Sequence, residues 1–189
     1  MNWIMVGLVA WVMLGLEKGL RGALELGASG IAPSFVFVLA TFVALLAPAG
    51  TALWTCLALG LVIDLTHTVS LSAGGSAVVV GPYALGYVLG CQLVLTMRGV
   101  MMGRNPLSLG FLALVASIVC HIVVVAVFAV RGLMVNDVAW AASGQLVPRL
   151  GSALYTGGLA VGLALVLFPM AGALGLSGPQ ARRFGRRVS

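Results

Sequence analysis

The segment Gly60-Leu-Val-Ile-Asp64-Leu-Thr-His67, and the later segment Gly81-Pro82-Tyr83-Ala-Leu-Gly86-Tyr87-Val-Leu-Gly90, decide the fold of this chain. Asp64 is the only acid between Glu25 and Asp137, and it stands at the end of a long apolar run. A carboxylate near the centre of a membrane helix costs roughly 2.5–3.5 kcal/mol on insertion scales. A partner group, a water-filled pocket or the membrane surface must offset that cost.

The composition indicates a chain that dissolves in lipid. Hydrophobic residues make up 61% of the 189 residues and charged residues only 7%, whereas a soluble domain carries about 25% charged residues. The apolar runs are continuous, whereas the strands of a membrane barrel alternate apolar and polar positions. We therefore expect an all-α, polytopic membrane helix bundle over residues 1–176, followed by a basic tail at 177–189.

Six apolar runs approach the length of about 20 residues that spans a bilayer. They cover residues 2–16, 31–47, 51–68, 76–97, 107–130 and 152–174. The bundle would have five spanning helices if residues 51–68 do not cross fully. No Lys or Arg precedes Glu17, which favours a retained first helix over a cleaved signal peptide. Pro82 is expected to kink the fourth run.

The connections between the runs differ in character. Residues 17–32 are polar and glycine-rich, and Glu17, Arg21 and Glu25 follow one another at four-residue spacing, which predicts a solvated surface helix laced by ion pairs. Residues 69–75 are expected to form a flexible link. Residues 131–151 form the longest polar connection.

The basic residues predict that both termini are cytoplasmic. This orientation places six basic residues inside and four outside, in agreement with the positive-inside rule. The inner set is Arg98, Arg104, Arg182, Arg183, Arg186 and Arg187, and the outer set is Lys18, Arg21, Arg131 and Arg149. We expect the four tail arginines to hold the tail at anionic lipid rather than to bind nucleic acid. The orientation puts Asp64 toward the outer end of its helix.

The intramembrane polar candidates are Asp64, His67 and His121. Asp64 and His67 share a helix face, and His121 falls near the middle of the fifth run. One interpretation is a proton or ligand site in which Asp64 pairs with a histidine from another helix. The interpretation that we favour has Asp64 bonding backbone near a helix end and His121 bonding a neighbouring helix. No metal-binding pattern is present, and we expect no catalytic residue, metal or cofactor.

Gly86 and Gly90 flank Tyr87 and fit the small-xxx-small pattern that lets membrane helices approach closely. About as many such pairs occur in this sequence as its glycine content produces by chance. We expect these glycines to pack helices within the chain, with dimerisation as the alternative.

Several of these features together resemble the MreD family of the bacterial rod-shape machinery. They are the block Gly60-Leu-Val-Ile-Asp64-Leu65, the motif Gly86-Tyr87-Val-Leu-Gly90, the loop arginines Arg98 and Arg104, and the segment Pro148-Arg-Leu-Gly-Ser-Ala-Leu-Tyr155. The resemblance covers roughly residues 14–175. The link after Asp64 is about two residues longer than is usual in the family, and Thr156 stands where the family often has Asn.

The resemblance implies a non-enzymatic scaffold in the bacterial inner membrane. Such a scaffold binds MreC, a single-pass protein, and helps to couple the MreB filament to RodA and its class B penicillin-binding protein. We expect the partner surface at residues 131–151 and the adjoining helix ends, with Trp140 as an anchor and with Pro148 and Tyr155 nearby.

The family is also similar in fold to the substrate-binding subunits of energy-coupling-factor transporters. The alternative function is therefore a vitamin-type uptake subunit. Such a subunit needs a pocket of convergent polar groups. The sequence offers few of them besides the outer connection, namely Asp64, His67, Gln92 and His121. We therefore favour the scaffold.

Overall fold

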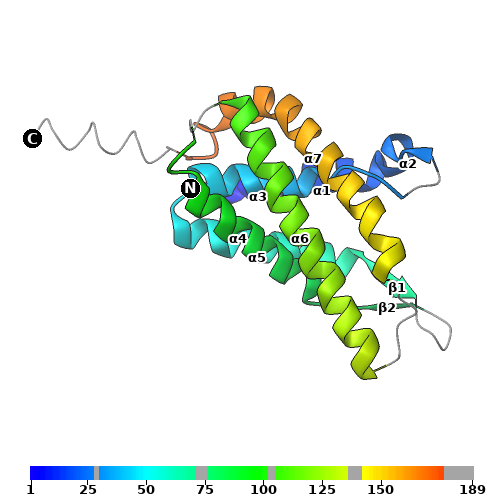
Figure 1. Ribbon diagram of the computed structural model, residues 1–189. Coiled ribbons are helices and arrows are strands. Elements are labelled where there is room, and N and C mark those ends of the chain that lie inside the picture. The colour runs from blue at the N-terminus through cyan, green and yellow to red at the C-terminus, as the bar shows by residue number, and fades with distance from the viewer. Residues whose placement is uncertain (28–29, 71–75, 102–104, 136–141, 177–189) are drawn as a thin grey trace, which may run out of the picture.

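The computed structural model describes residues 1–27, 30–70, 76–101, 105–135 and 142–176. This part of the chain is a bundle of helices with one small β-hairpin (Figure 1). The elements are α1 (Trp3–Gly19), α2 (Arg21–Leu24), α3 (Phe35–Leu46), α4 (Ala49–Thr66), β1 (Thr68–Ser70), β2 (Ser76–Val78), α5 (Pro82–Met97), α6 (Pro106–Val135) and α7 (Ala142–Met170). The amide of Asn2 donates to the carbonyl of Leu174 at 3.0 Å, so α1 starts at the end of the bundle where α7 finishes.

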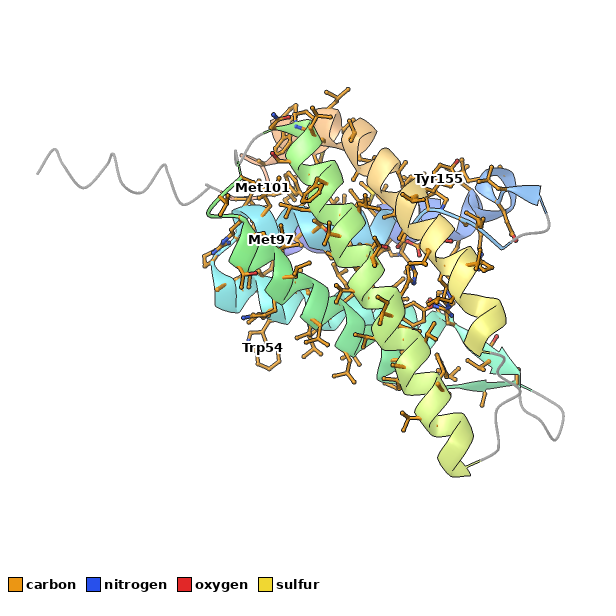
Figure 2. All side chains as sticks on the ribbon, viewed as in Figure 1. Trp54, Met97, Met101 and Tyr155 are labelled. Carbon is orange, nitrogen blue, oxygen red and sulfur yellow. The ribbon has the colours of Figure 1, made fainter. Side chains whose placement is uncertain are left out.

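Three of the described helices contain segments long and apolar enough to cross a membrane. These segments are Ala49–Thr66, Pro106–Gly132 and Leu146–Met170, and Phe35–Leu46 and Pro82–Met97 are shorter apolar helices. The predicted all-α class is confirmed, and the helices indicate a membrane protein. Their outer surfaces are apolar, as a lipid-facing surface must be. Trp54, for example, is 70% exposed and points away from the neighbouring helices (Figure 2).

The helix α3 lies at the centre of the bundle and packs against α1, α4, α5, α6 and α7. All twelve of its residues are buried. Because water cannot reach a buried helix end, the protein must supply partners for its free amides and carbonyls. Ser34 supplies one of them as the N-cap, since its hydroxyl accepts a hydrogen bond from the amide of Phe37.

Charged side chains from other parts of the chain complete both ends of α3. At the first turn, the carboxylate of Glu17 accepts hydrogen bonds of 3.0 Å from the amide of Val36 and from the hydroxyl of Ser34. At the last turn, Nη1 of Arg98 donates to the carbonyls of Ala44, at 3.0 Å, and Ala47, at 2.6 Å. The negative charge thus lies at the positive end of the helix dipole and the positive charge at its negative end.

Glycines allow α4, α5 and α6 to approach closely. A Cβ atom added at Gly60 on α4 would lie 2.6 Å from the Cα atom of Ala84 on α5. A Cβ atom added at Gly86 would lie 2.6 Å from Sγ of Cys120 on α6, and one added at Gly90 would lie 3.2 Å from the carbonyl oxygen of Ala116. Gly86 and Gly90 therefore face a helix of their own chain.

The start of the fourth apolar run differs from the prediction. Residues 76–78 form β2, which pairs with β1 in antiparallel fashion, and the helix starts only at Pro82. Gly81 has φ +129°, a conformation that favours glycine. Pro82 occupies the first helical position, where its missing N–H has no intrahelical partner to lose. The expectation that Pro82 kinks a helix is therefore wrong, because Pro82 begins the helix.

The polar connection predicted at residues 131–151 is largely helical. The helix α6 continues to Val135 and α7 begins at Ala142. Pro148 lies inside α7. The helices thus extend beyond the apolar runs that mark them in the sequence, because arginine and glutamine have helix propensities close to that of leucine.

Candidate functional site

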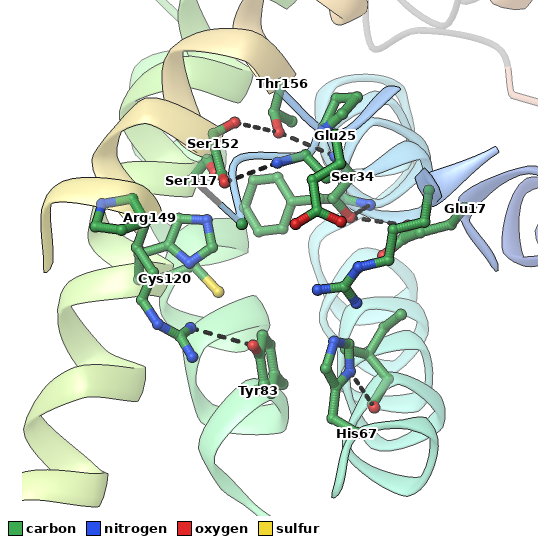
Figure 3. Close-up of a pocket in the computed structure, with 18 of the residues that line it drawn as sticks. Glu17, Glu25, Ser34, His67, Tyr83, Ser117, Cys120, Arg149, Ser152 and Thr156 are labelled. Atoms are coloured by element: carbon green, nitrogen blue, oxygen red, sulfur yellow. Dashed lines mark hydrogen bonds between the residues drawn. The ribbon is translucent and has the colours of Figure 1, made fainter. Parts of the chain in front are cut away.

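A cavity of about 390 Å³ lies near the end of the bundle opposite Asn2 and Leu174. Figure 3 shows the side chains that line it. It is bounded by the last turn of α1, by residues of the 21–34 segment, and by the facing parts of α4, α5, α6 and α7. Its charged and imidazole-bearing lining residues are Glu17, Arg21, Glu25, His67, His121 and Arg149. The sequence led us to expect few convergent polar groups. This expectation is wrong, because the fold brings polar side chains from distant segments together around the cavity.

Glu17 belongs to this cavity and also holds the start of α3, as described above. The sequence predicted that Glu17 lies on a solvated helix face. The structure instead places it against the first turn of α3, and α1 extends past it to Gly19. The partner groups of Glu17 lie 17 and 19 residues further along the chain, so local spacing could not reveal them.

Asp64 is 1% exposed and bonds to the start of α5. Its carboxylate oxygens accept hydrogen bonds from the amides of Gly81, Tyr83 and Ala84, at 2.9, 2.9 and 3.0 Å. The intervening Pro82 has no N–H to satisfy. Asp64 therefore caps a neighbouring helix, and it is not a lining residue of the cavity.

His67 lies just beyond α4 and lines the cavity. Its Nδ1 atom is 3.0 Å from the carbonyl oxygen of Ile63, and its ring stacks on the ring of Tyr83 with centroids 5.0 Å apart. Burial lowers the pKa of His67, and the positive charges of Lys18, Arg21 and Arg149 lower it further. The bond to Ile63 acts in the opposite direction. The structure therefore favours neutral His67.

Arg149 on α7 contacts the same tyrosine. Its Nη1 atom donates to the hydroxyl of Tyr83 at 3.1 Å, and its guanidinium carbon lies 5.8 Å from the centroid of that ring. His67, Tyr83 and Arg149 therefore form one polar, aromatic wall of the cavity (Figure 3).

His121 lines the cavity from α6. Its Nδ1 atom is buried and has no hydrogen-bond partner among the residues that the structure describes. Buried polar atoms are nearly always hydrogen-bonded, so this atom is an exception among the described residues. This atom makes no hydrogen bond to a neighbouring helix within the described part of the chain, so the expectation that His121 bonds a neighbouring helix is not confirmed.

Hydroxyl groups of α7 tie down the segment that leads into α3. Oγ of Ser152 accepts a hydrogen bond of 3.2 Å from the amide of Ala32, and Oγ1 of Thr156 accepts one of 3.1 Å from the amide of Ser34. The Thr156 hydroxyl also donates to the carbonyl of Ser152 at 2.7 Å. Thr156 thus makes a side-chain bond at the position where the sequence departs from the MreD pattern.

The remaining candidates from the sequence lie elsewhere. Tyr87 is 3% exposed and its ring meets that of Phe37 edge-on, with centroids 4.9 Å apart. Pro148 lines the cavity, and Tyr155 is a half-buried residue of α7 (Figure 2). The predicted anchor and the predicted lipid-binding tail lie outside the described residues, namely Trp140, Arg182, Arg183, Arg186 and Arg187.

The arrangement is suited to binding a small polar molecule. It combines carboxylates, guanidinium groups and hydroxyls with the aromatic rings of Phe37, Tyr83 and Tyr87. No cluster of three or more His, Cys, Asp or Glu residues that could hold a metal occurs within the described ranges.

Comparisons with protein-family models, with curated proteins and with solved structures found no match for this chain.

Proposed function

We propose that this chain is a non-enzymatic scaffold of the cell-elongation machinery in the bacterial inner membrane, of the MreD type. In this proposal it crosses the membrane with six helices and has both termini in the cytoplasm. Its partners are an MreC-like single-pass protein, RodA with its class B penicillin-binding protein, and the MreB filament. The proposal rests on the sequence resemblance and on one outer surface of α7.

That surface carries the proposal because it suits a single transmembrane helix. Val147, Leu154 and Leu165 are 73%, 65% and 70% exposed and lie on one face of α7. Between them Gly158 and Gly162 are exposed, and nothing lies within 4 Å of a Cβ atom added at either. Small residues with this spacing let a second helix approach closely. The face runs for about 27 Å, close to the thickness of a bilayer core.

The role of Asp64 also supports the proposal. The block Gly60–Leu65 carries the family resemblance, and in the fold its acid holds the start of α5 while Gly60 lets the two helices touch. Gly60 and Asp64 thus hold two helices of the chain together. A scaffold that acts through its outer surface is expected to use such residues for internal packing.

Depletion of the protein in its own cells tests the proposed function. We expect rods to become spheres, because elongation would lose its coupling to wall synthesis. The wild-type gene should restore rods, and a gene carrying Gly158→Leu, which fills the α7 face, should not. Rods that persist after complete depletion would contradict the proposal.

The cavity favours a second candidate, the small-molecule-binding subunit of an energy-coupling-factor transporter. A subunit of this kind needs a pocket of several hundred cubic ångströms with convergent polar groups, and the cavity has that size and such groups. Depletion would then abolish uptake of one small molecule and leave cell shape unchanged. The two candidates are therefore separated by cell shape and uptake measured in the same depleted cells.

A further inference from the structure

We infer that the cavity binds a small zwitterionic molecule with an apolar or aromatic body, of the chemical class of the amino acids. This inference goes beyond the scaffold role and does not depend on it. It follows from the size of the cavity, from its aromatic lining and from the balance and positions of its charges.

The size of the cavity fits a small molecule. Its volume of about 390 Å³ falls within the range of about 300–1,000 Å³ that is usual for ligand pockets. Phe37, Tyr83 and Tyr87 provide an aromatic part of the lining. Two of these rings are themselves fixed, Tyr87 by Phe37 and Tyr83 by His67 and Arg149. The aromatic surface is therefore preorganised for an apolar group.

The charges of the lining residues select for zero net charge. Two carboxylates, Glu17 and Glu25, and two guanidinium groups, Arg21 and Arg149, line the cavity. A ligand with a net charge would leave one group in this partly enclosed space unbalanced, which is costly. A zwitterion adds one charge of each sign and keeps the balance.

The positions of the charges separate the two ends of such a ligand. Oε2 of Glu17 already accepts two hydrogen bonds at the start of α3, so we place the ligand's ammonium group at Glu25. Figure 3 shows the Glu25 carboxylate directed into the cavity and Arg149 on another side of it, next to Tyr83. We place the ligand's carboxylate at Arg149, because a guanidinium group has five donors and binds carboxylates in bidentate fashion.

His121 adds a neutral polar side chain to the lining of the cavity. Its buried Nδ1 atom has no partner within the described chain, although the residue lines the cavity.

The first test titrates the purified full-length protein in detergent with L-phenylalanine and the other standard amino acids, by calorimetry and by thermal unfolding. We expect at least one zwitterion to bind and to raise the melting temperature. L-Phenylalaninamide, which lacks the carboxylate, and 3-phenylpropionate, which lacks the ammonium group, should bind less tightly than L-phenylalanine. The inference would be overturned if no amino acid binds, or if both analogues bind as tightly as L-phenylalanine.

Variants then locate the site. Arg149→Gln and Glu25→Gln should each weaken binding by about tenfold or more, because each removes a charged hydrogen-bonding group. Arg131→Gln is the matched control, since Arg131 carries the same charge and is not a lining residue, and it should bind as the wild type does. Unchanged affinity in both Arg149→Gln and Glu25→Gln would overturn the inference. Glu25→Gln keeps the test valid if Arg149→Gln does not fold. Recovery of the MreC-like partner in the same preparations reports on the scaffold role separately.

Discussion

The carboxylate of Asp64 on α4 accepts a hydrogen bond of 2.9 Å from the backbone amide of Tyr83 on α5. Other charged side chains of this bundle also bond the backbone of a neighbouring helix. Glu17 bonds the first turn of α3 and Arg98 bonds its last turn. Lys18 donates to the carbonyl of Thr66 at the end of α4. Four charged residues in the described part of the chain thus bond backbone groups at helix ends.

Replacement of Asp64 tests the first of these caps. Asp64→Asn should lower the free energy of unfolding by about 1–3 kcal/mol, because an amide carries no charge and has only one acceptor oxygen for three amides. Asp64→Ala should be at least as destabilising, since it leaves all three amides without that partner. Thermal unfolding of the full chain in detergent measures both effects. Wild-type stability in Asp64→Ala would contradict the assigned cap.

Replacement of Arg98 tests the cap at the last turn of α3. Arg98→Gln should destabilise the protein by about 1–3 kcal/mol, because two carbonyls at a buried helix end lose a charged donor. Arg21→Gln, at an exposed position, is the comparison for the loss of a positive charge. The assignment fails if the two variants unfold at the same temperature.

Two neighbouring glycines of α7 should respond in opposite ways to alanine. A Cβ atom at Gly157 would lie 2.9 Å from Cβ of Leu114 on α6, whereas nothing lies within 4 Å of one at Gly158. Gly157→Ala should therefore cost about 1–3 kcal/mol by forcing the helices apart. Gly158→Ala should be neutral or should stabilise by up to about 1 kcal/mol, because alanine favours the helix. Equal melting temperatures would show that α6 and α7 do not pack as described.

His67 should make stability depend on pH. Its pKa in the folded protein is lowered from the ordinary value of 6.5, so below that pH the unfolded chain binds the proton more readily than the folded chain. Stability should therefore fall as the pH drops from about 6.5 toward the lowered pKa. His67→Gln should remove this part of the pH dependence, measured as melting temperature against pH. Identical profiles for the two proteins would contradict a buried, neutral His67.

The apolar runs were sufficient to predict the helices that form the bundle, because each run is continuous and is bounded by charges, prolines or glycines. Boundaries were predicted less well. The run Ser-Ala-Val-Val-Val at 76–80 reads as membrane helix, yet its first part pairs with β1, because β-branched residues suit a strand equally well. Pro148 and its polar neighbours read as a loop, yet α7 includes them.

The cavity was not predictable from the sequence. Its lining comes from segments between Glu17 and Thr156, and the sequence does not state which of them meet. Glu17 illustrates the difficulty, because its spacing to Arg21 matches a solvated helix while its actual partners belong to α3. Asp64 and His121 were recognisable as unusual membrane residues, but their different environments depend on which helices they face.

The most direct test of the scaffold role is affinity purification of the tagged full-length protein from its own membranes, with mass spectrometry of the proteins that remain bound. We predict recovery of an MreC-like single-pass protein with the wild type. Gly158→Leu should lose this partner although the variant folds, because the added side chain meets no atom of its own chain near the Cβ position and fills the α7 face. Gly7→Leu, at an equally open glycine on α1, should keep the partner. Purification of the wild type without any single-pass partner, or equal recovery with Gly158→Leu, would contradict the account.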